Sequence, residues 1–305
     1  MAVTIKKIGD IALEAMLFEV SATPKPGLVD RNNNGAHRDM DYFTFMRSAT
    51  ALRGAFGEFA RTGREHAPDG IENLLSFLQA EGIAAERSMF AATKGVNTHK
   101  GMIFSLGILC GAAGFALGSK QVLTAEILFD LSEKITSGLT AAAYGDIGKK
   151  PAAELTKGER MFLKYGVTGV RGEAESGFAS VKNIALPIYR QRRNANLSVN
   201  DALVDTLLYL IAGTYDTNIL GRHDMAALIY ARNYAKDAIS AGGMETKAGR
   251  AKIAEMDRAF IEHWISPGGS ADLLAVTHFV YEIEKSAKDL PVKTNIQQEA
   301  HISKS

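Results

Sequence analysis

The stretch Gly101–Gly118, GMIFSLGILCGAAGFALG, decides what kind of protein this chain is, because it runs for eighteen residues without a charge. Its length alone would admit a short transmembrane span. Five glycines, a serine and several alanines make it only mildly apolar, and no second stretch of this kind follows. We therefore interpret it as the buried core helix of a protein without a membrane-spanning segment.

Four glycines in this stretch recur at helical spacing. Gly107, Gly111, Gly114 and Gly118 follow one another in steps of four, three and four residues, so a helix would carry one face without side chains. Such a face lets another helix approach closely, or lets a flat ligand lie against the backbone. The pattern leaves both uses open and favours close packing.

Helical periodicity continues on both sides of this stretch. Apolar residues recur at positions 0, 3, 4 and 7 over residues 13–20 and again over residues 204–211. Strand patterns are nearly absent, and no internal repeat is visible. Ser198 and Ser270 are typical of helix N-caps. We expect helices near 5–21, 41–61, 69–92, 98–117, 121–143, 151–164, 174–195, 199–213, 223–241, 246–264 and 269–287.

The sequence therefore predicts an all-α fold: a single compact multi-helix domain of about ten to twelve helices over residues 1–288. The remaining residues, 289–305, are polar and aperiodic, and we expect a flexible tail.

Composition excludes several classes of function. The chain is 46% hydrophobic and 23% charged, and its net charge is only +1. No global field therefore draws it to nucleic acid or to an anionic membrane. Cys110 is the single cysteine and lies in an apolar run, where a buried, inert thiol is expected. These features favour a cytoplasmic enzyme, and they leave monomer and homodimer both open.

The longest break between expected helices is EVSATPKPGLVDRNNNGAHRDMD at 19–41. A connection between helices usually needs two to eight residues. A polar break of this length therefore indicates a ligand-binding wall. Its candidate functional side chains are Lys25, Arg31, His37, Asp39 and Asp41. The alternating carboxylates Asp39 and Asp41 suit a hard cation such as Mg²⁺. The alternative for Asp41 is the N-cap of the next helix.

A second break, TKGVNTHKGMIFS at 93–105, leads into the glycine-rich helix. Asn97 or Thr98 would cap that helix, and His99 and Lys100 would fall in its first turn. Free backbone N–H groups, the positive end of the helix dipole and a lysine together make an anion site. A simple capped helix is the alternative.

The third break, YGVTGVRGEAESG at 165–177, surrounds three charged side chains with glycines. Arg171 offers a guanidinium fork, and Glu173 and Glu175 offer carboxylates. The alternative for Glu173 is a first-turn acid of the following helix.

The fourth break, GTYDTNILGRHDM at 213–225, places Asp216, Asn218, Arg222 and His223 between two apolar helices. The pair His223-Asp224 invites comparison with helical metal-dependent phosphohydrolases, in which His99 and Asp272 would have to complete the ligand set. For His223 alone, a hydrogen bond to a neighbour is the default reading.

Together these segments resemble the triphosphoribosyl-dephospho-coenzyme A synthase family, known from the citrate lyase and malonate decarboxylase systems. The similar stretches are EVSATPKPGLVDRNNNGAHRDMDYFTF, GVNTHKGMIFSLGILCGA, YGVTGVRGEAESGF, DTNILGRHD and SPGGSADLLA. They lie in family order over residues 19–275. The first stretch is the most specific of them.

The resemblance implies an all-helical pentosyltransferase. Members of the family join the triphosphoribosyl group of ATP to the 2′-hydroxyl of 3′-dephospho-CoA and release adenine. The product is the precursor of a prosthetic group that a separate transferase later attaches to an acyl carrier subunit. ATP and 3′-dephospho-CoA are then the substrates, and Mg²⁺ is an expected cofactor.

The residues of the four breaks fit this chemistry. The triphosphate needs cations and amides, and the oxocarbenium-like sugar needs a nearby carboxylate. The expected catalytic residues are Glu173, Glu175, Asp216 and His37, with Glu173 first as general base. The expected phosphate and nucleotide ligands are Lys25, Arg31, Asn97, Thr98, His99, Lys100, Arg171, Asn218, Arg222 and His223, and the expected metal ligands are Asp39 and Asp41. Protonation or hydrogen bonding of the leaving adenine is a task for Asn97, His37 or His223.

Two other functions remain open from the residues alone. One is a metal-dependent helical phosphohydrolase that acts on a nucleotide. The other is a non-catalytic helical module that holds coenzyme A or a nucleotide for a partner.

Overall fold

The fold is known from a computed structural model that describes residues 3–288, apart from the side chains of residues 152 and 157. Over these residues the chain forms fifteen α-helices and no β-strand, which confirms the all-α prediction. The expected tail, 289–305, lies outside the described residues. The helices are α1 (Ile5–Ser21), α2 (Tyr42–Leu52), α3 (Ala55–Glu65), α4 (Leu74–Ala92), α5 (Lys100–Gly118), α6 (Ala125–Ile135), α7 (Leu139–Tyr144), α8 (Lys157–Tyr165), α9 (Gly169–Glu175), α10 (Leu186–Asn194), α11 (Val199–Gly213), α12 (Thr217–Arg222), α13 (Met225–Ser240), α14 (Lys247–Glu262) and α15 (Gly268–Lys288).

The structure contains more helices than the sequence predicted, for local reasons. The helix expected at 41–61 is divided at 53–54 into α2 and α3. The helix expected at 121–143 is divided into α6, which ends at Ile135, and α7, whose N-cap is Gly138 with a φ of 78°. The short helices α9 and α12 form inside segments that were expected to be breaks.

Side-chain caps fix several helix starts. The hydroxyls of Thr4, Thr124, Ser198 and Thr246 accept hydrogen bonds from backbone N–H groups in the first turns of α1, α6, α11 and α14. Ser198 therefore has the predicted role. Ser270 does not, because α15 begins two residues earlier and the Ser270 side chain is buried within its first turn.

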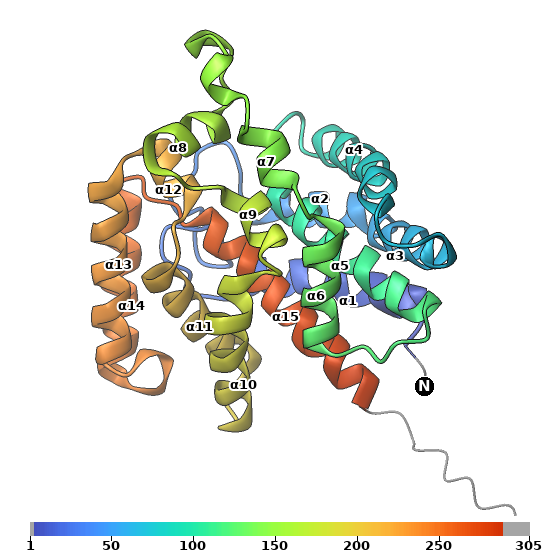
Figure 1. The fold of residues 1–305 in the computed structure, drawn as a ribbon. Helices are drawn as coiled ribbons and strands as arrows, with labels where there is room; N and C mark the ends of the chain where they lie inside the picture. The colour runs from blue at the N-terminus through green and yellow to red at the C-terminus, as the bar shows by residue number, and fades with distance from the viewer. Residues whose placement is uncertain (1–2, 289–305) are drawn as a thin grey trace, which may run out of the picture.

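Helix α5 lies at the centre of the molecule and is the core helix predicted from its sequence (Figure 1). It is the one helix among the described residues that is long and apolar enough to cross a membrane, yet 78% of it is buried inside the protein. Helices α1, α3, α4, α6 and α15 pack around it. Its Cys110 is buried, and burial raises the pKa of that thiol.

The glycine face of α5 is used for close packing against α3. A Cβ atom on Gly114 would lie 1.8 Å from the carbonyl oxygen of Ala60, and one on Gly63 of α3 would lie 2.0 Å from the carbonyl oxygen of Gly111. Real Cβ atoms cannot approach so closely, so glycine allows the two backbones to touch. The flat-ligand alternative for this face is excluded because α3 covers it.

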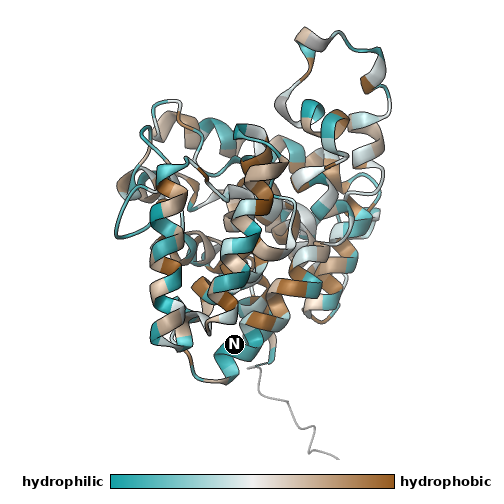
Figure 2. Cartoon of the chain, turned by 90° about the vertical axis from the view of Figure 1, so that its left-hand side faces the viewer, coloured by the Kyte–Doolittle hydropathy of each residue, from teal (hydrophilic) through white to brown (hydrophobic). Residues whose placement is uncertain are grey.

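The second half of the chain covers the other side of this core. Helix α15 packs against α1, α5 and α11, and α13 packs against α11 and α14. Seen from the side of α13 and α14, hydrophilic and hydrophobic residues alternate along the helices, as expected where amphipathic helices cover a core (Figure 2). Chain segments distant in sequence, α1 and α15, thus lie side by side.

Candidate active site

A single cavity of about 1170 Å³ lies where the polar breaks between helices meet. Its wall includes residues from the loop before α2, the starts of α5, α9, α12 and α15, and the end of α1. Ligand sites for one small molecule typically measure roughly 300–1,000 Å³. The cavity is therefore large enough for two substrates, and it brings together segments from residue 19 to residue 273.

The long loop between α1 and α2 is held in shape by one carboxylate. The buried Asp30 accepts hydrogen bonds from the Thr23 hydroxyl at 2.6 Å and from the backbone N–H groups of Lys25, Asn32 and Asn33 at 2.7–3.0 Å. These bonds fold residues 23–33 around a single point. The loop is thus a shaped wall, although it contains no regular helix or strand.

A second carboxylate attaches this loop to α14. Asp257 accepts hydrogen bonds from the backbone N–H of Gly27 at 3.0 Å and from the side-chain amide of Asn33 at 2.9 Å. Gly27 has a φ of 70°, and a Cβ atom there would lie 2.1 Å from the carbonyl oxygen of Ile265. Only glycine fits, because the loop backbone lies directly against the segment before α15.

At the floor of the cavity a buried ion pair joins the loop to α1. The Lys25 ammonium donates to the Glu19 carboxylate, and both side chains are at least 97% buried. Burial raises the pKa of Glu19, and the nearby Lys25 opposes that shift.

The start of α5 forms a second part of the wall. The Asn97 side-chain oxygen accepts a hydrogen bond from the Lys100 N–H at 3.1 Å, as expected of a capping group. The Lys100 ammonium lies 2.9 Å from the Glu86 carboxylate at the edge of the cavity. Thr98 lines the cavity beside them.

Glu173 faces the cavity from α9. Its carboxylate accepts hydrogen bonds from the N–H of Ser180, at 3.2 Å, and from the Ser180 hydroxyl. Burial raises the pKa of Glu173, and the two hydrogen bonds from Ser180 oppose that shift. Arg171, two residues earlier, is exposed and lines the same cavity.

Asp216 joins the starts of α12 and α15. One carboxylate oxygen caps α12 by accepting from the N–H groups of Asn218 and Ile219 at 2.9 and 3.3 Å. The other accepts from the N–H and the hydroxyl of Ser270 at 2.7 and 2.9 Å. Burial raises the pKa of Asp216. Three of these bonds are from backbone N–H groups and the fourth is from the Ser270 side chain, so Asp216 positions the two helix starts.

At the other end of α12, Arg222 contacts the long loop. Its guanidinium donates to the carbonyl of Ala36 at 3.1 Å and lies 3.4 Å from Nδ1 of His37. The His37 Nε2 lies 2.9 Å from the Ser266 hydroxyl. Burial and the charge of Arg222 lower the pKa of His37 to about 4, so the ring is neutral at neutral pH.

Most of the predicted site residues line this one cavity. They are Lys25, His37, Asn97, Thr98, Lys100, Arg171, Glu173, Asp216, Asn218 and Arg222. Segments that are up to two hundred residues apart in the sequence therefore converge as expected.

Six predicted residues do not line the cavity, and each lies beside another protein group instead. Arg31 donates to Asn200 at 3.1 Å, and Glu175 accepts from Thr140 at the start of α7. His223 lies 2.9 Å from the carbonyl of Trp264.

The two expected metal ligands and His99 complete this group. Asp41 caps α2 through a reciprocal pair of hydrogen bonds with Thr44, which is the alternative weighed for it. Asp39 is 64% exposed beside His37. The buried His99 contacts the Ser48 hydroxyl at 2.6 Å, and burial and Lys25 lower the pKa of His99 to about 3.

The sequence reasoning missed three acidic residues of the cavity, Glu19, Glu86 and Asp272. Asp272 was considered only as a possible ligand in a phosphohydrolase. Asp272 stands alone in the apolar run that follows Ser270, and no nearby charge drew attention to it. The signal that could have found it is an isolated acid on the first turns of a buried helix.

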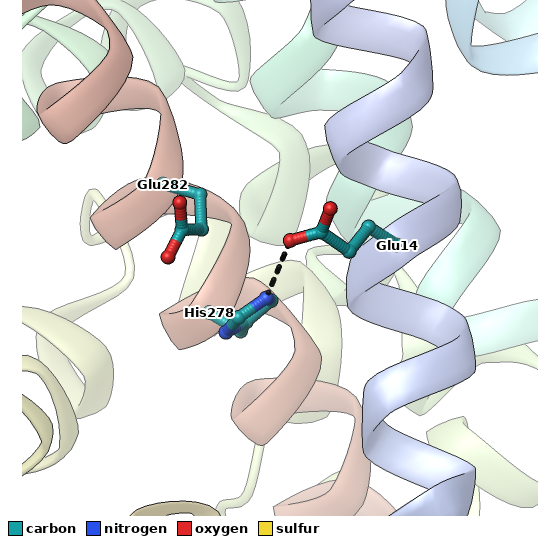
Figure 3. Close-up of side chains that lie close together, drawn as sticks. All are labelled: Glu14, His278 and Glu282. Atoms are coloured by element: carbon teal, nitrogen blue, oxygen red, sulfur yellow. Dashed lines mark hydrogen bonds and ion pairs between the residues drawn. The ribbon is translucent and has the colours of Figure 1, made fainter. Parts of the chain in front are cut away.

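A second cluster of ionisable side chains lies between α1 and α15 (Figure 3). Glu14, His278 and Glu282 each place one side-chain atom within 4.8 Å of the others. The His278 ring is buried, with Nδ1 at 2.9 Å from the Tyr189 hydroxyl and Nε2 at 3.2 Å from Glu14. Both ring nitrogens thus have protein partners, so the cluster links α1, α10 and α15.

Comparison with known proteins identifies a family whose match covers the fold and the residues of the cavity. The family model for CitG, ATP:dephospho-CoA triphosphoribosyl transferase, matches residues 5–290. The chain is 42% identical over 271 residues to the 2-(5″-triphosphoribosyl)-3′-dephosphocoenzyme-A synthase of Pectobacterium atrosepticum, covering 88% of this chain and 86% of that protein.

Two further relatives carry the same name with the qualifier "probable". The protein of Vibrio cholerae serotype O1 is 42% identical, over 90% of this chain and 88% of its own length. The protein of Lactiplantibacillus plantarum is 41% identical, over 90% of this chain and 96% of its own length. No solved structure matches.

Proposed function

Because this chain belongs to the ATP:dephospho-CoA triphosphoribosyl transferase family, we propose that the transfer takes place in the cavity at the start of α5 and α15. The chain is a transferase that uses ATP and 3′-dephospho-CoA as substrates. Since the ribose and its triphosphate both move, the bond that breaks in ATP is the one between C1′ and adenine, and adenine leaves.

The observation that carries this proposal is the composition of the cavity wall. The first turns of two long helices, α5 and α15, reach it, and Arg171 and Arg222 also line it. Backbone N–H groups at helix starts and arginine forks are the groups that hold phosphates. We assign the triphosphate to this side of the cavity, with Lys100, Asn97 and Asn218 as further ligands.

Glu173 is the proposed general base. A carboxylate held near the sugar stabilises the positive charge that develops at C1′, and it accepts the proton of the attacking 2′-hydroxyl. The two hydrogen bonds from Ser180 hold the Glu173 carboxylate in place and favour its charged form. Glu175 is a weaker candidate, because Thr140 occupies its carboxylate outside the cavity wall.

In this proposal magnesium is bound only to the triphosphate. The expected ligands Asp39 and Asp41 do not fit a site in the cavity, since the first is exposed beside His37 and the second caps α2. We therefore derive no step through the metal. Bound to the phosphates, Mg²⁺ would supply charge neutralisation.

The remaining elements of the proposal come from the family resemblance. We infer that residues 1–288 act as one catalytic domain and that the protein is cytoplasmic. Its product would serve citrate lyase or malonate decarboxylase after a separate transferase attaches it to an acyl carrier subunit. A homodimer stays a prediction for the oligomeric state.

One chromatographic experiment tests the activity. The protein is incubated with ATP, 3′-dephospho-CoA and Mg²⁺, and the mixture is separated and weighed by mass spectrometry. Free adenine together with a heavier coenzyme adduct is the expected result. Phosphate or pyrophosphate in place of adenine would indicate a phosphohydrolase, and ligand-induced thermal stabilisation without turnover would indicate a binding module.

A further inference from the structure

Asp272, on the second turn of α15, differs from every other described acid in the cavity wall. Glu19 is paired with Lys25, Glu86 with Lys100, and Glu173 with Ser180, while Asp216 accepts four hydrogen bonds. Among residues 3–288, the Asp272 side chain has neither a hydrogen bond nor an ion pair, although the residue lines the cavity. Its carboxyl group is therefore available to a substrate.

The fold places this carboxyl group against the start of α5. A Cβ atom on Gly101 would lie 2.1 Å from Oδ2 of Asp272, so the missing side chain at position 101 makes room for it. The Asp272 side chain is only partly buried here, and Lys100 is the residue next to Gly101. Asp272 thus reaches the cavity beside the start of α5.

Its surroundings favour the protonated form. Burial raises the pKa of Asp272 well above the usual range of an aspartate, and the carboxylates of Glu19 and Asp216 raise it further. Glu173 differs, because the hydrogen bonds from Ser180 oppose the effect of burial on its pKa. Burial thus raises the pKa of both carboxyl groups, but only Glu173 has hydrogen bonds that favour its charged form, so Asp272 is the better suited of the two to the acid role.

The reaction needs such an acid, and the residues first expected to help adenine leave do not supply it. Asn97 lines the cavity, but its amide can only form a hydrogen bond and cannot transfer a proton. Adenine departs far more easily when a ring nitrogen receives a proton as the C1′–N9 bond breaks. His223 does not line the cavity and is held by Trp264. His37 has both ring nitrogens beside protein groups, Ser266 and Arg222, and its pKa is lowered to about 4.

We propose that Asp272 is the general acid that protonates the leaving adenine, an inference that rests on the proposed function. The C1′–N9 electron pair goes to adenine, and the Asp272 carboxyl proton goes to a ring nitrogen, so neutral adenine leaves. The 2′-oxygen of dephospho-CoA forms the new bond to C1′, and its proton goes to Glu173. Solvent returns the proton from Glu173 to Asp272 between turnovers.

The test compares ATP with an ATP analogue methylated at N7. The purine of 7-methyl-ATP is already positively charged, so it leaves as a neutral base without an acid. Asp272→Asn should lower kcat for ATP about 10²–10⁴-fold, the usual contribution of a general acid. The same variant should turn over 7-methyl-ATP at about the rate of the unmodified enzyme, because this leaving group needs no acid.

Two further variants complete the experiment. Asp272→Glu keeps an acid and should recover part of the ATP activity. Asp237→Asn, the same exchange at an exposed position on α13, should leave the rates with both substrates unchanged. Circular dichroism shows whether each variant is folded.

An equal loss with ATP and 7-methyl-ATP would overturn the proposal, since it would indicate a structural role or a metal-holding role for Asp272. A higher KM with unchanged kcat would also overturn it. Absence of adenine with the unmodified enzyme would instead refute the proposed function itself.

Discussion

Glu173 is the general base of the proposed reaction. Glu173→Gln keeps the size of the side chain and can still bond to Ser180, but it cannot accept a proton. We expect adenine release to fall by about 10²–10⁴-fold while the protein stays folded. The measurement is the initial rate of adenine release by chromatography. Near-normal turnover would remove Glu173 from the role of base.

His99 leads to a prediction about pH. Its pKa is about 3 in the folded protein, because burial and Lys25 disfavour the charged ring, against an ordinary value of 6.5. Between these two values the unfolded chain binds one proton that the folded protein does not, so this group lowers stability as the pH falls below 6.5.

His99→Asn removes that titration. Unfolding by urea should show the variant destabilised at pH 7.5, with the gap to the unmodified protein narrowing by up to about 2 kcal/mol at pH 5, since each pKa unit corresponds to about 1.4 kcal/mol. A gap that stays constant from pH 7.5 to pH 5 would show that His99 is not held neutral.

The residue scale also shows what the sequence could not reveal. Arg31, Glu175 and His223 have the right chemistry in the right segments, yet Asn200, Thr140 and Trp264 hold them outside the cavity. Which way a loop side chain points depends on partners far along the chain. Sequence pattern therefore located the segments of the site better than its individual side chains.

At the scale of elements, the contact between α3 and α5 depends on missing side chains. Gly114→Ala would bring a Cβ atom to 1.8 Å from the Ala60 carbonyl oxygen, and backbone cannot rotate away as a side chain can. The two helices must move apart, which we expect to lower the free energy of unfolding by about 2 kcal/mol or more.

Gly57→Ala on α3 is the matched control. A Cβ atom at Gly57 meets nothing within 4 Å, so alanine's better helix propensity should raise stability by about 0.5–1 kcal/mol. Urea titrations of both variants measure the difference. If Gly114→Ala were as stable as Gly57→Ala, the two backbones would not be in contact.

Helix existence and type were predictable at this scale, because apolar periodicity and caps such as Ser198 act locally. The breaks inside 41–61 and 121–143 were not predictable. The apolar periodicity continues on both sides of each break, and only the backbone at the break departs from the helix. The short helices α9 and α12 were missed for the opposite reason. Their glycines and polar residues are typical of loops, and they pack against neighbouring helices, α9 against α5, α6 and α7, and α12 against α8, α13 and α15.

At the scale of the whole molecule, one apolar helix organises the fold. Helix α5 is buried by α1, α3, α4, α6 and α15, so its eighteen uncharged residues mark the centre of the protein. The polar breaks then lie around one end of this core and face one another across the cavity. That convergence was expected from the sequence, whereas the isolation of Asp272 could be recognised only once its neighbours were known.

The cavity takes part of its wall from α1 and part from α15, the first and last helices of residues 3–288. A nascent polypeptide on the ribosome therefore has no complete site until α15 has been made. ATP cannot be split by a molecule that has only its earlier helices, because α15 supplies residues that complete the site.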